Sequence, residues 1–549
     1  MIIKAAHYLL TFLVFIIPVV WWTRLNANYY STKLTLLFLA GALAWLAIPQ
    51  KIKLLKLPKV MLWSLVVIVL YQIVFHTYTF KLDDFLYLFK FLSFSGLIFW
   101  LYSQDLDLEK LYQKATYGIF LTACVILVLS GFELYTNRIV KLSIDVRTTL
   151  STFGNVNMFA EFLVLTLPLI FHWSRYKDKA PEFVKLMVLL LWVFFVLYCN
   201  SRSAWIGLVL WLIILFRYNT SKKELAVSGM AFLLYGAFLY LPSQKNNIDA
   251  EVDKVTSKSI RLALYEATFA MIKDHPWGIE AGRYMGEIEP YQMNSQNKPS
   301  EFNYYDQPHS EFLKWGAQFG WAFLGVVLVC FFSIVFQLSK WFFNQKNAYL
   351  VESFVVLLPQ MLFQFPFENP ASLVYLSLVF ALFFKEFVVT KAINVNRGYR
   401  LASVFLFLAG FYSAAGFVYS VYQESTLPRN ENIISACYYY PINIKACHAK
   451  HAYYLDNKKY DQFVQDFKTD FMKEPFFVDY LRLLPTYYSI QQNGKKTCQS
   501  LFLYKVIFPE QKAFEKKYYD GCVSVPDTFY FDEPKKFKAR YLTWLDNLN

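Results

Sequence analysis

Long apolar runs alternate with short polar segments along most of the chain, up to about residue 421. With their flanks, the runs have roughly the 17–22 residues that a helix needs to cross a bilayer. Backbone polar groups in lipid must be satisfied within the segment, so we interpret the runs as helices rather than strands. Clear examples are Leu9–Trp22, Leu34–Ile48, Val60–Phe75, Tyr117–Leu134, Met187–Tyr198, Trp205–Phe216, Ala226–Leu241, Trp321–Phe336, Ser372–Phe384 and Leu401–Tyr419. The pattern predicts an all-α polytopic membrane protein with about thirteen transmembrane helices.

Two polar stretches interrupt this pattern and divide the chain into four expected parts. Residues 243–310 form a long loop, and residues 422–549 form a tail with helical periodicity at Lys459–Phe471 and Val478–Gln491. Loops of such length are uncommon in compact proteins unless they carry function. We therefore expect N-terminal transmembrane helices (1–242), a catalytic loop (243–310), C-terminal transmembrane helices (311–421) and a helical C-terminal domain (422–549).

The positive charges orient this predicted bundle. Lys and Arg number 54 against 40 Asp and Glu, and 56% of the residues are hydrophobic, which is too apolar for a soluble protein of this length. The Lys- and Arg-rich short segments are Gln50–Lys59, Ser174–Lys185, Arg217–Lys223, Lys340–Lys346 and Lys385–Arg400. Cytoplasmic loops carry such an excess. The loop 243–310 and the tail are then external, and the net charge of +14 reflects topology rather than nucleic-acid binding.

The cysteines agree with an external tail. Three of the seven lie in or beside predicted helices, and the other four are Cys437, Cys447, Cys498 and Cys522 in the tail. An even set in a soluble domain is typical of two disulfides in an oxidising periplasm, although four separate thiols are the alternative. The sequence leaves the pairing open.

Polar residues beside the external ends of the runs are the candidates for chemistry, because a charge near hydrocarbon is costly and usually faces a cavity, partner or pathway. Asn155 and Asn157 stand at the outer start of the sixth predicted helix. Both types are common in turns and caps, so they are either structural or part of a site. Arg202 stands where two apolar runs meet almost without a loop. It is either an interfacial anchor or a phosphate ligand, which its planar fork suits.

The long loop holds the remaining candidates. Arg261 opens the amphipathic stretch Arg261–Lys273, four residues before Tyr265, and Arg283 follows farther along. That stretch either lies on the membrane surface or presents a second phosphate-facing arginine. His309, in the sequence Gln307-Pro308-His309-Ser310-Glu311, is either a helix cap or a group that transfers a proton near neutral pH.

Taken in order, these elements form a set. The chain has Asn-x-Asn at a helix start, Ser-Arg-x-Ala-Trp-x-Gly between two helices, Arg-x3-Tyr and then Pro-x-Gly in the long loop, and His-Ser-x2-Leu-x2-Gly-x3-Gly at the loop exit. This order resembles the O-antigen ligase superfamily of membrane glycosyltransferases, best over Gly154–Gly325. Two positions depart from the usual pattern of that family: Phe323 stands where another Gly is usual, and Tyr265 where Trp is common.

The resemblance implies glycan transfer from undecaprenyl diphosphate to an acceptor on the periplasmic face of a bacterial inner membrane, without metal, cofactor or nucleotide sugar. Negative charge would build on the departing diphosphate, and Arg202, Arg261 and Arg283 would stabilise it. His309 would remove the proton of the acceptor hydroxyl or fix its position. Supporting residues would be Asn155, Asn157, Tyr265 and Glu368.

The acceptor is left open among three kinds of molecule. The external domain at the C-terminus looks more like the protein O-oligosaccharyltransferases that glycosylate pilins, so a periplasmic protein is the expected acceptor. The alternatives are a lipid A core, as in O-antigen ligases, and a growing glycan, as in O-antigen polymerases.

A transporter of lipid-linked glycans would place ionisable residues near helix midpoints, where Lys90 is the main one here. A scaffold without chemistry is the remaining alternative.

Overall fold

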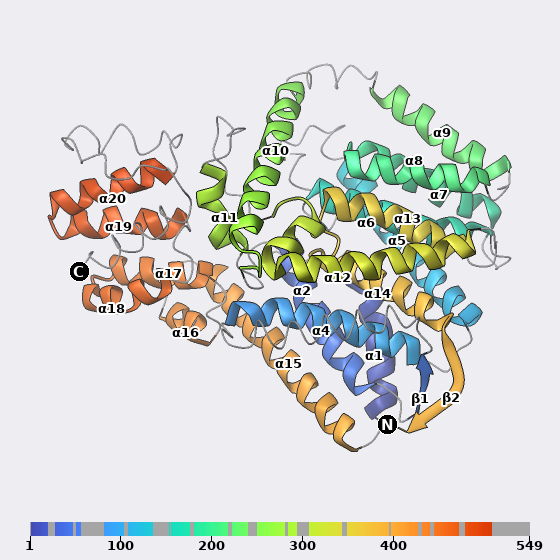
Figure 1. Cartoon of the computed structure of the whole chain (residues 1–549), viewed down its shortest axis with the longest axis horizontal. Coiled ribbons are helices and arrows are strands. Elements are labelled where there is room, and N and C mark those ends of the chain that lie inside the picture. The colour runs from blue at the N-terminus through green and yellow to red at the C-terminus, as the bar shows by residue number, and fades with distance from the viewer. Residues whose placement is uncertain are drawn as a thin grey trace.

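The residues that the structure describes form a helical bundle with one short β ladder (Figure 1). The computed structural model describes residues 2–19, 28–47, 51–55, 82–103, 108–134, 153, 155–175, 181–217, 222–239, 250–279, 284–293, 307–342, 348–394, 397–425, 431–439, 444–471 and 478–507. This architecture is consistent with the expected all-α membrane protein, and the ladder is an addition that the sequence pattern did not predict.

The helices of the predicted membrane region follow the apolar runs. They are α1 (Ile2–Ile16), α2 (Asn28–Leu46), α4 (Leu82–Ser103), α5 (Leu108–Leu134), α6 (Val156–Arg175), α7 (Glu182–Tyr198), α8 (Arg202–Arg217), α9 (Lys222–Leu239), α12 (Glu311–Trp341), α13 (Ala348–Phe363), α14 (Pro370–Lys385) and α15 (Arg397–Ser425). Between α9 and α12, the long loop contains α10 (Ala250–Asp274) and α11 (Tyr284–Met293). The expected amphipathic stretch in the loop is thus a helix, and it begins earlier than its sequence pattern suggested.

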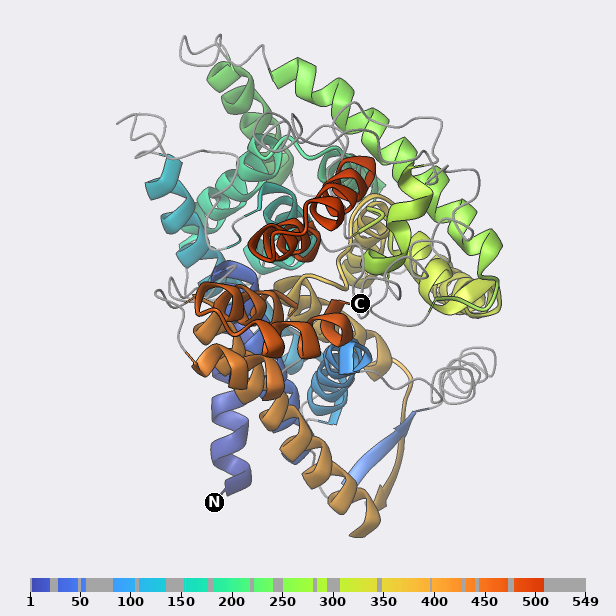
Figure 2. The ribbon, with the colours of Figure 1, turned by 90° about the vertical axis from the view of Figure 1, so that its left-hand side faces the viewer.

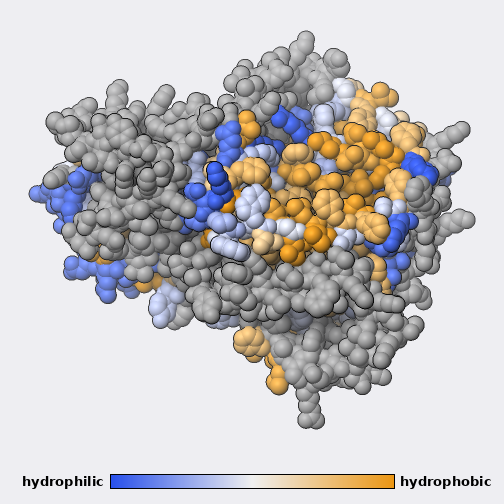
Figure 3. Space-filling view, viewed as in Figure 1, coloured by the Kyte–Doolittle hydropathy of each residue, from blue (hydrophilic) through white to orange (hydrophobic). Residues whose placement is uncertain are grey.

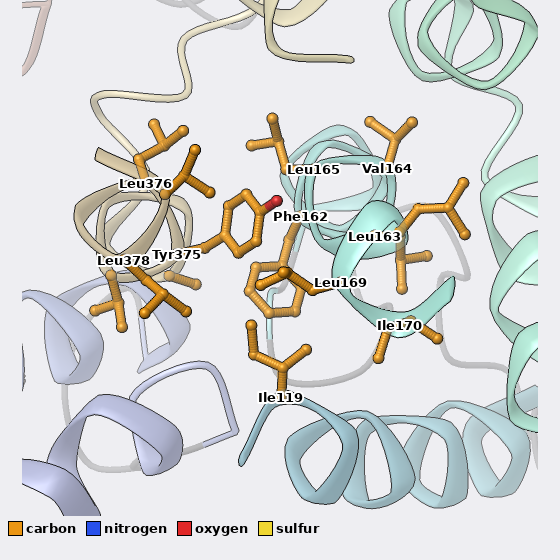
Figure 4. Close-up of a cluster of buried hydrophobic side chains, with 14 of the residues drawn as sticks. Ile119, Phe162, Leu163, Val164, Leu165, Leu169, Ile170, Tyr375, Leu376 and Leu378 are labelled. Atoms are coloured by element: carbon orange, nitrogen blue, oxygen red, sulfur yellow. The ribbon is translucent and has the colours of Figure 1, made fainter. Parts of the chain in front are cut away.

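The core lies around α6, which packs against α5, α7, α13 and α14. Figure 4 shows leucine and phenylalanine side chains of α6 facing Tyr375 and its neighbours on α14, with Ile119 of α5 beneath them. The indole of Trp192 on α7 donates to the Leu163 carbonyl of α6 at 2.9 Å. Since α6 touches helices from both halves of the chain, it fixes the elements that surround the candidate site.

Apolar side chains also cover part of the surface, as expected for a protein embedded in lipid. Figure 3 shows hydrophobic residues gathered over the face on which α8, α12 and α13 lie. Among the described residues, α12 alone is long and apolar enough by itself to cross a membrane, and shorter apolar helices are Lys33–Leu46, Thr116–Phe132, Val156–His172, Ala348–Phe363 and Pro370–Lys385. The number of about thirteen crossings stays a prediction, and the run Val60–Phe75 lies outside the described residues.

The β ladder joins two segments that are far apart in sequence. Strand β1 (Lys51–Leu55) pairs antiparallel with β2 (Val388–Asn394), with Lys51 opposite Asn394. Both strands fall in lysine- and arginine-rich segments that the charge pattern assigns to the cytoplasm. Their pairing requires the two segments to lie on the same side of the membrane, which agrees with that assignment.

The tail folds as a separate group of helices. These are α16 (Asn432–Tyr439), α17 (Ile444–Asp456), α18 (Tyr460–Phe471), α19 (Val478–Ile490) and α20 (Gly494–Ile507), and Figure 2 shows them together in front of the membrane helices. The two helices expected from periodicity correspond to α18 and α19. A disulfide joins Cys437 to Cys447, and Cys498 is also disulfide-bonded, whereas Cys522 lies outside the described residues.

Candidate functional site

The loop exit at His309 has a strained backbone. His309 has a φ of 51°, in the left-handed region that non-glycine residues seldom adopt. Such conformations cost on the order of 1–3 kcal/mol and persist where the surroundings hold them. The next residue, Ser310, caps α12 by accepting a hydrogen bond from the Leu313 amide at 3.5 Å. The cap of this helix is therefore Ser310, so the alternative that His309 caps α12 is not supported.

Two glycines allow the segment that follows α10 to contact α12 closely. Gly320 has a φ of 82° and makes a kink inside α12, and Gly278 follows α10 with a φ of 93°. A Cβ on Gly320 would overlap the Pro276 carbonyl, and one on Gly278 would overlap the Gln318 carbonyl. The Trp321 amide donates to that same Pro276 oxygen at 3.0 Å. The Pro-x-Gly and Gly-x3-Gly motifs are therefore the two sides of one backbone contact.

This contact places the polar side of α10 beside His309. The Tyr265 hydroxyl donates to the His309 carbonyl at 3.4 Å, and Arg261 stands one turn before Tyr265. Burial lowers the pKa of His309 to about 4, and the Arg261 charge acts in the same direction. The imidazole is therefore neutral at physiological pH, the form that accepts a proton.

Arg202 approaches the same region from a different helix. The turn between α7 and α8 is tight because Asn200 adopts a φ of 51°, and Arg202 follows as the first residue of α8, with its side chain exposed. Burial lowers the pKa of Arg261, and the charge of Arg202 lowers it too, so the two guanidinium groups lie close enough to repel. Within the described residues neither of them forms an ion pair. Two unneutralised arginines beside a helix N-terminus favour an anionic ligand.

Glu368 lies in a buried ion cluster rather than on an open surface. Its carboxylate binds Lys90 of α4 and, at 2.6 Å, Lys314 of α12. Burial alone would raise the pKa of Glu368, but Lys314 and Lys90 hold it at about 2. Lys314 also donates to the Gln307 side-chain carbonyl at 2.7 Å. Glu368 therefore carries a negative charge that two lysines neutralise, which suits a structural role beside the site.

The turn that carries Glu368 is fixed to α6 and α12 by further buried groups. Glu311, which is completely buried, accepts from the Phe367 amide at 2.8 Å. Glu161 of α6 accepts from Ser372 at 2.6 Å and from Asn369 at 3.2 Å. The ring of Phe365 lies 5.5 Å from that of His309. The turn thus forms one wall of the His309 environment.

The remaining candidates lie differently. Asn155 caps α6 by accepting from the amides of Asn157 at 2.8 Å and Met158 at 3.3 Å, which is the structural alternative for this motif. Arg283 lies outside the described residues. The described residues include one group with metal-like spacing, Cys437, Cys447 and Asp470, but its two cysteines form the disulfide.

Sequence reasoning gave no role at the site to four residues that support it, namely Lys90, Glu161, Glu311 and Lys314. Each is a charged residue within a predicted apolar segment or at its edge, and burial of a charge there requires a partner. The presence of a charged residue in an apolar segment was therefore the signal from which these residues could have been found. The partners could not be inferred, because Lys90 and Glu368 are 278 positions apart.

One comparison with known proteins identifies a related family. A search among curated proteins gave no match. Residues 186–330 match the family described as O-antigen ligase, whose members are integral inner-membrane proteins. The matched segment runs from α7 into α12 and includes Arg202, Arg261 and His309. This segment is therefore similar to the O-antigen ligase family, which agrees with the resemblance carried by the sequence motifs.

Proposed function

We propose that the protein transfers an oligosaccharide from an undecaprenyl-diphosphate carrier to a hydroxyl group of a periplasmic protein. The observation that carries this proposal is the convergence of Arg202, Arg261 and a neutral His309 from three separate elements. Cationic groups without counterions suit a diphosphate, and a neutral imidazole beside them suits a hydroxyl group. The match to the O-antigen ligase family over the same residues supports the same reaction class.

In the proposed reaction, the acceptor oxygen attacks the anomeric carbon of the first sugar. The bond from that carbon to the diphosphate oxygen breaks, and undecaprenyl diphosphate leaves with the electron pair. Arg202 and Arg261 stabilise the negative charge that develops on the leaving oxygen. His309 receives the proton of the acceptor hydroxyl as the new glycosidic bond forms. Arg283 is a third candidate for the diphosphate.

Diphosphate binding would strengthen His309 as a base. Burial and the Arg261 charge hold the pKa of His309 near 4, where the imidazole accepts protons weakly. A bound diphosphate neutralises the arginines and places negative charge near the ring, and a nearby opposite charge favours imidazolium. The site would therefore gain basicity when the donor is in place, which limits proton transfer to the loaded enzyme.

The proposed orientation places this chemistry in the periplasm. The candidate residues lie at the ends of helices opposite to the lysine- and arginine-rich segments, including those that carry β1 and β2. The disulfide between Cys437 and Cys447 supports an oxidising compartment for the tail. The lipid-linked donor and the acceptor would then meet on the outer face of the inner membrane.

The tail domain favours a protein acceptor. Helices α16–α20 follow the last predicted crossing and form a folded unit with its own buried core, including Cys437, Phe463 and Leu484. A domain outside the bilayer can present a surface to a folded protein, which transfer to a lipid A core does not require. Ligation to a lipid A core and polymerisation of O-antigen units are the competing acceptor classes.

The proposal is tested with purified protein, a lipid-linked oligosaccharide and three acceptors supplied separately: a pilin-like protein, a lipid A core and a second lipid-linked glycan. We expect transfer to the protein and its loss by at least about a hundredfold in His309→Ala at unchanged thermal stability. His309→Asn should be nearly as inactive, because an amide keeps hydrogen bonds without basicity. Transfer only to the lipid A core or to the glycan would show that the acceptor is not a protein. Normal transfer by His309→Ala would overturn the catalytic role of His309.

A further inference from the structure

A lysine buried behind the candidate site connects both sides of the His309 segment. Lys314 lies on the first turns of α12, and its side chain is only 5% exposed. Its ammonium group donates to Gln307 at 2.7 Å and to Glu368 at 2.6 Å. Gln307 precedes His309 by two residues and Lys314 follows it by five. The Lys314–Gln307 hydrogen bond therefore closes a short loop with His309 inside it.

His309 needs such a constraint. Its left-handed backbone is unfavourable in isolation, and the tyrosine contact to its carbonyl, at 3.4 Å, is long. A charge-assisted hydrogen bond is stronger than a neutral one. Lys314 forms such a bond with Gln307, two residues before His309, and Glu368 fixes Lys314 from the other side.

We propose that Lys314 is a positioning residue, which holds His309 in its strained conformation by binding Gln307 and Glu368 at the same time. This inference rests on the proposed role of His309 as the group that receives the acceptor proton. Lys314 itself has no contact with the reacting atoms in this mechanism. Its effect is geometric: without it, the Gln307–His309 segment relaxes, and the imidazole leaves the position facing Arg261.

The cluster makes this proposal testable without destroying the fold. Glu368 also pairs with Lys90, so Lys314→Met removes one cation but leaves the carboxylate with a partner. Changing Gln307 disturbs even less, because that side chain is only partly buried and the Lys314–Glu368 pair remains. Gln307→Leu should break the bond to Lys314, whereas Gln307→Glu should retain it as an ion pair.

We expect Lys314→Met and Gln307→Leu to lower kcat by about tenfold to a hundredfold, because small displacements of a catalytic group have effects of this size. The KM for the lipid-linked glycan should change less than about twofold, since Arg202 and Arg261 are untouched. Gln307→Glu should restore most of kcat. The matched control is Lys340→Met, at the exposed far end of the same helix, and it should behave as the unmodified protein.

A second measurement does not depend on activity. Diethyl pyrocarbonate modifies accessible neutral imidazole, and mass spectrometry of the full-length protein in detergent gives the rate at His309. We expect slow modification in the unmodified protein, Gln307→Glu and Lys340→Met, and modification several times faster in Lys314→Met and Gln307→Leu. A purely structural role would not be rescued by Gln307→Glu.

The pH dependence gives a third readout. Exposure of His309 should move the acid limb of kcat/KM from about pH 4 toward the 6.5 of an unperturbed imidazole, with the variants otherwise folded. Among the described residues, the charge of Arg261 acts on His309 and the Tyr265 hydroxyl contacts its carbonyl. Glu311, Lys314 and Glu368 form the neighbouring charged cluster.

The outcomes separate this inference from the proposed function. Absence of transfer by the unmodified protein, together with a His309 modification rate that follows the Gln307 and Lys314 variants, would reject the function and support the positioning role. Transfer that requires His309 but is unaffected in Lys314→Met and Gln307→Leu would overturn the positioning role alone. If Lys314→Met fails to fold, the two Gln307 variants decide the question by the same criteria.

Discussion

Gly278 and Gly320 each lie against the backbone of the segment that carries the other. Gly278 has the Gln318 carbonyl where its side chain would be, and Gly320 has the Pro276 carbonyl. Both have positive φ values, so glycine is required there for conformation as well as for space. This contact holds α10 against α12, and the relative position of Arg261 and His309 depends on it.

Gly320→Ala is therefore expected to destabilise the protein by about 2–4 kcal/mol and to reduce transfer strongly, because the added methyl group overlaps the backbone and φ is unfavourable. Thermal unfolding in detergent and the transfer assay measure the two effects. Gly325→Ala is the control on the same helix, since a Cβ there meets nothing within 4 Å. Equal stability of the two variants would contradict the interlocked arrangement.

The two arginines are expected to act on the diphosphate. Replacing either Arg202 or Arg261 by Ala should lower kcat/KM by about a hundredfold to a thousandfold, the usual effect of losing one contact to a developing oxyanion. Lysine at either position should also be impaired, because a point charge does not reproduce the planar fork. Turnover with lipid-linked glycan checks this. Near-normal activity of both Ala variants would show that neither arginine binds the diphosphate.

The pH dependence follows from the pKa of His309. Only neutral imidazole accepts the proton, so kcat/KM, which reports the free enzyme, should stay constant from about pH 8 to about pH 5 and fall through pH 4. The acid limb of the kcat profile should lie at higher pH, because bound diphosphate raises the pKa of His309. An inflection of kcat/KM near pH 6.5 would indicate an exposed histidine instead.

Stability must be followed over the same pH range. Below about pH 6.5 the unfolded chain protonates His309, while the folded protein does so only near pH 4. Folding therefore loses stability as the pH falls from 6.5 to 4, and protonation of Glu368 opposes folding between 4.5 and about 2. Activity should be compared only where the unfolding temperature shows a folded protein.

Topology is tested with a reporter that is active only in the periplasm. A fusion after Asn549 should be active, and one after Lys179 should be silent, because the charge pattern places these positions on opposite sides. The β1–β2 pairing adds that fusions near Leu55 and Asn394 must give the same result as each other. Activity at Lys179 with silence at Asn549 would reverse the orientation and, with it, the periplasmic site.

Part of the fold follows from the sequence, whereas the roles of the candidate site residues stay predictions. Apolar periodicity located helices because lipid and core both select for it, and motif order singled out Arg202, Arg261 and His309 as site candidates. The amphipathic stretch after Arg261 was also predicted as a helix, although its start at Ala250 was not, because the residues before Arg261 lack an apolar stripe.

Other features depend on contacts that a single sequence does not encode locally. Four tail cysteines permit three pairings, so the Cys437–Cys447 bond required the fold. The β ladder pairs segments more than three hundred positions apart through backbone hydrogen bonds, which no side-chain pattern specifies. Glu368 could be placed at the external turn, but its charge balance depends on lysines from α4 and α12.

The ion pair between Lys90 and Glu368 limits how the motif-bearing region can be exchanged between relatives. Both residues lie outside the matched segment 186–330, on opposite sides of it in the chain, yet they meet Lys314, which lies within it. A chimaera that imports only this segment would receive the arginines and the histidine together with a lysine whose counterion belongs to the host. Such chimaeras should be active only when Lys90, Lys314 and Glu368 all come from the same protein. The region that must be exchanged is therefore larger than residues 186–330.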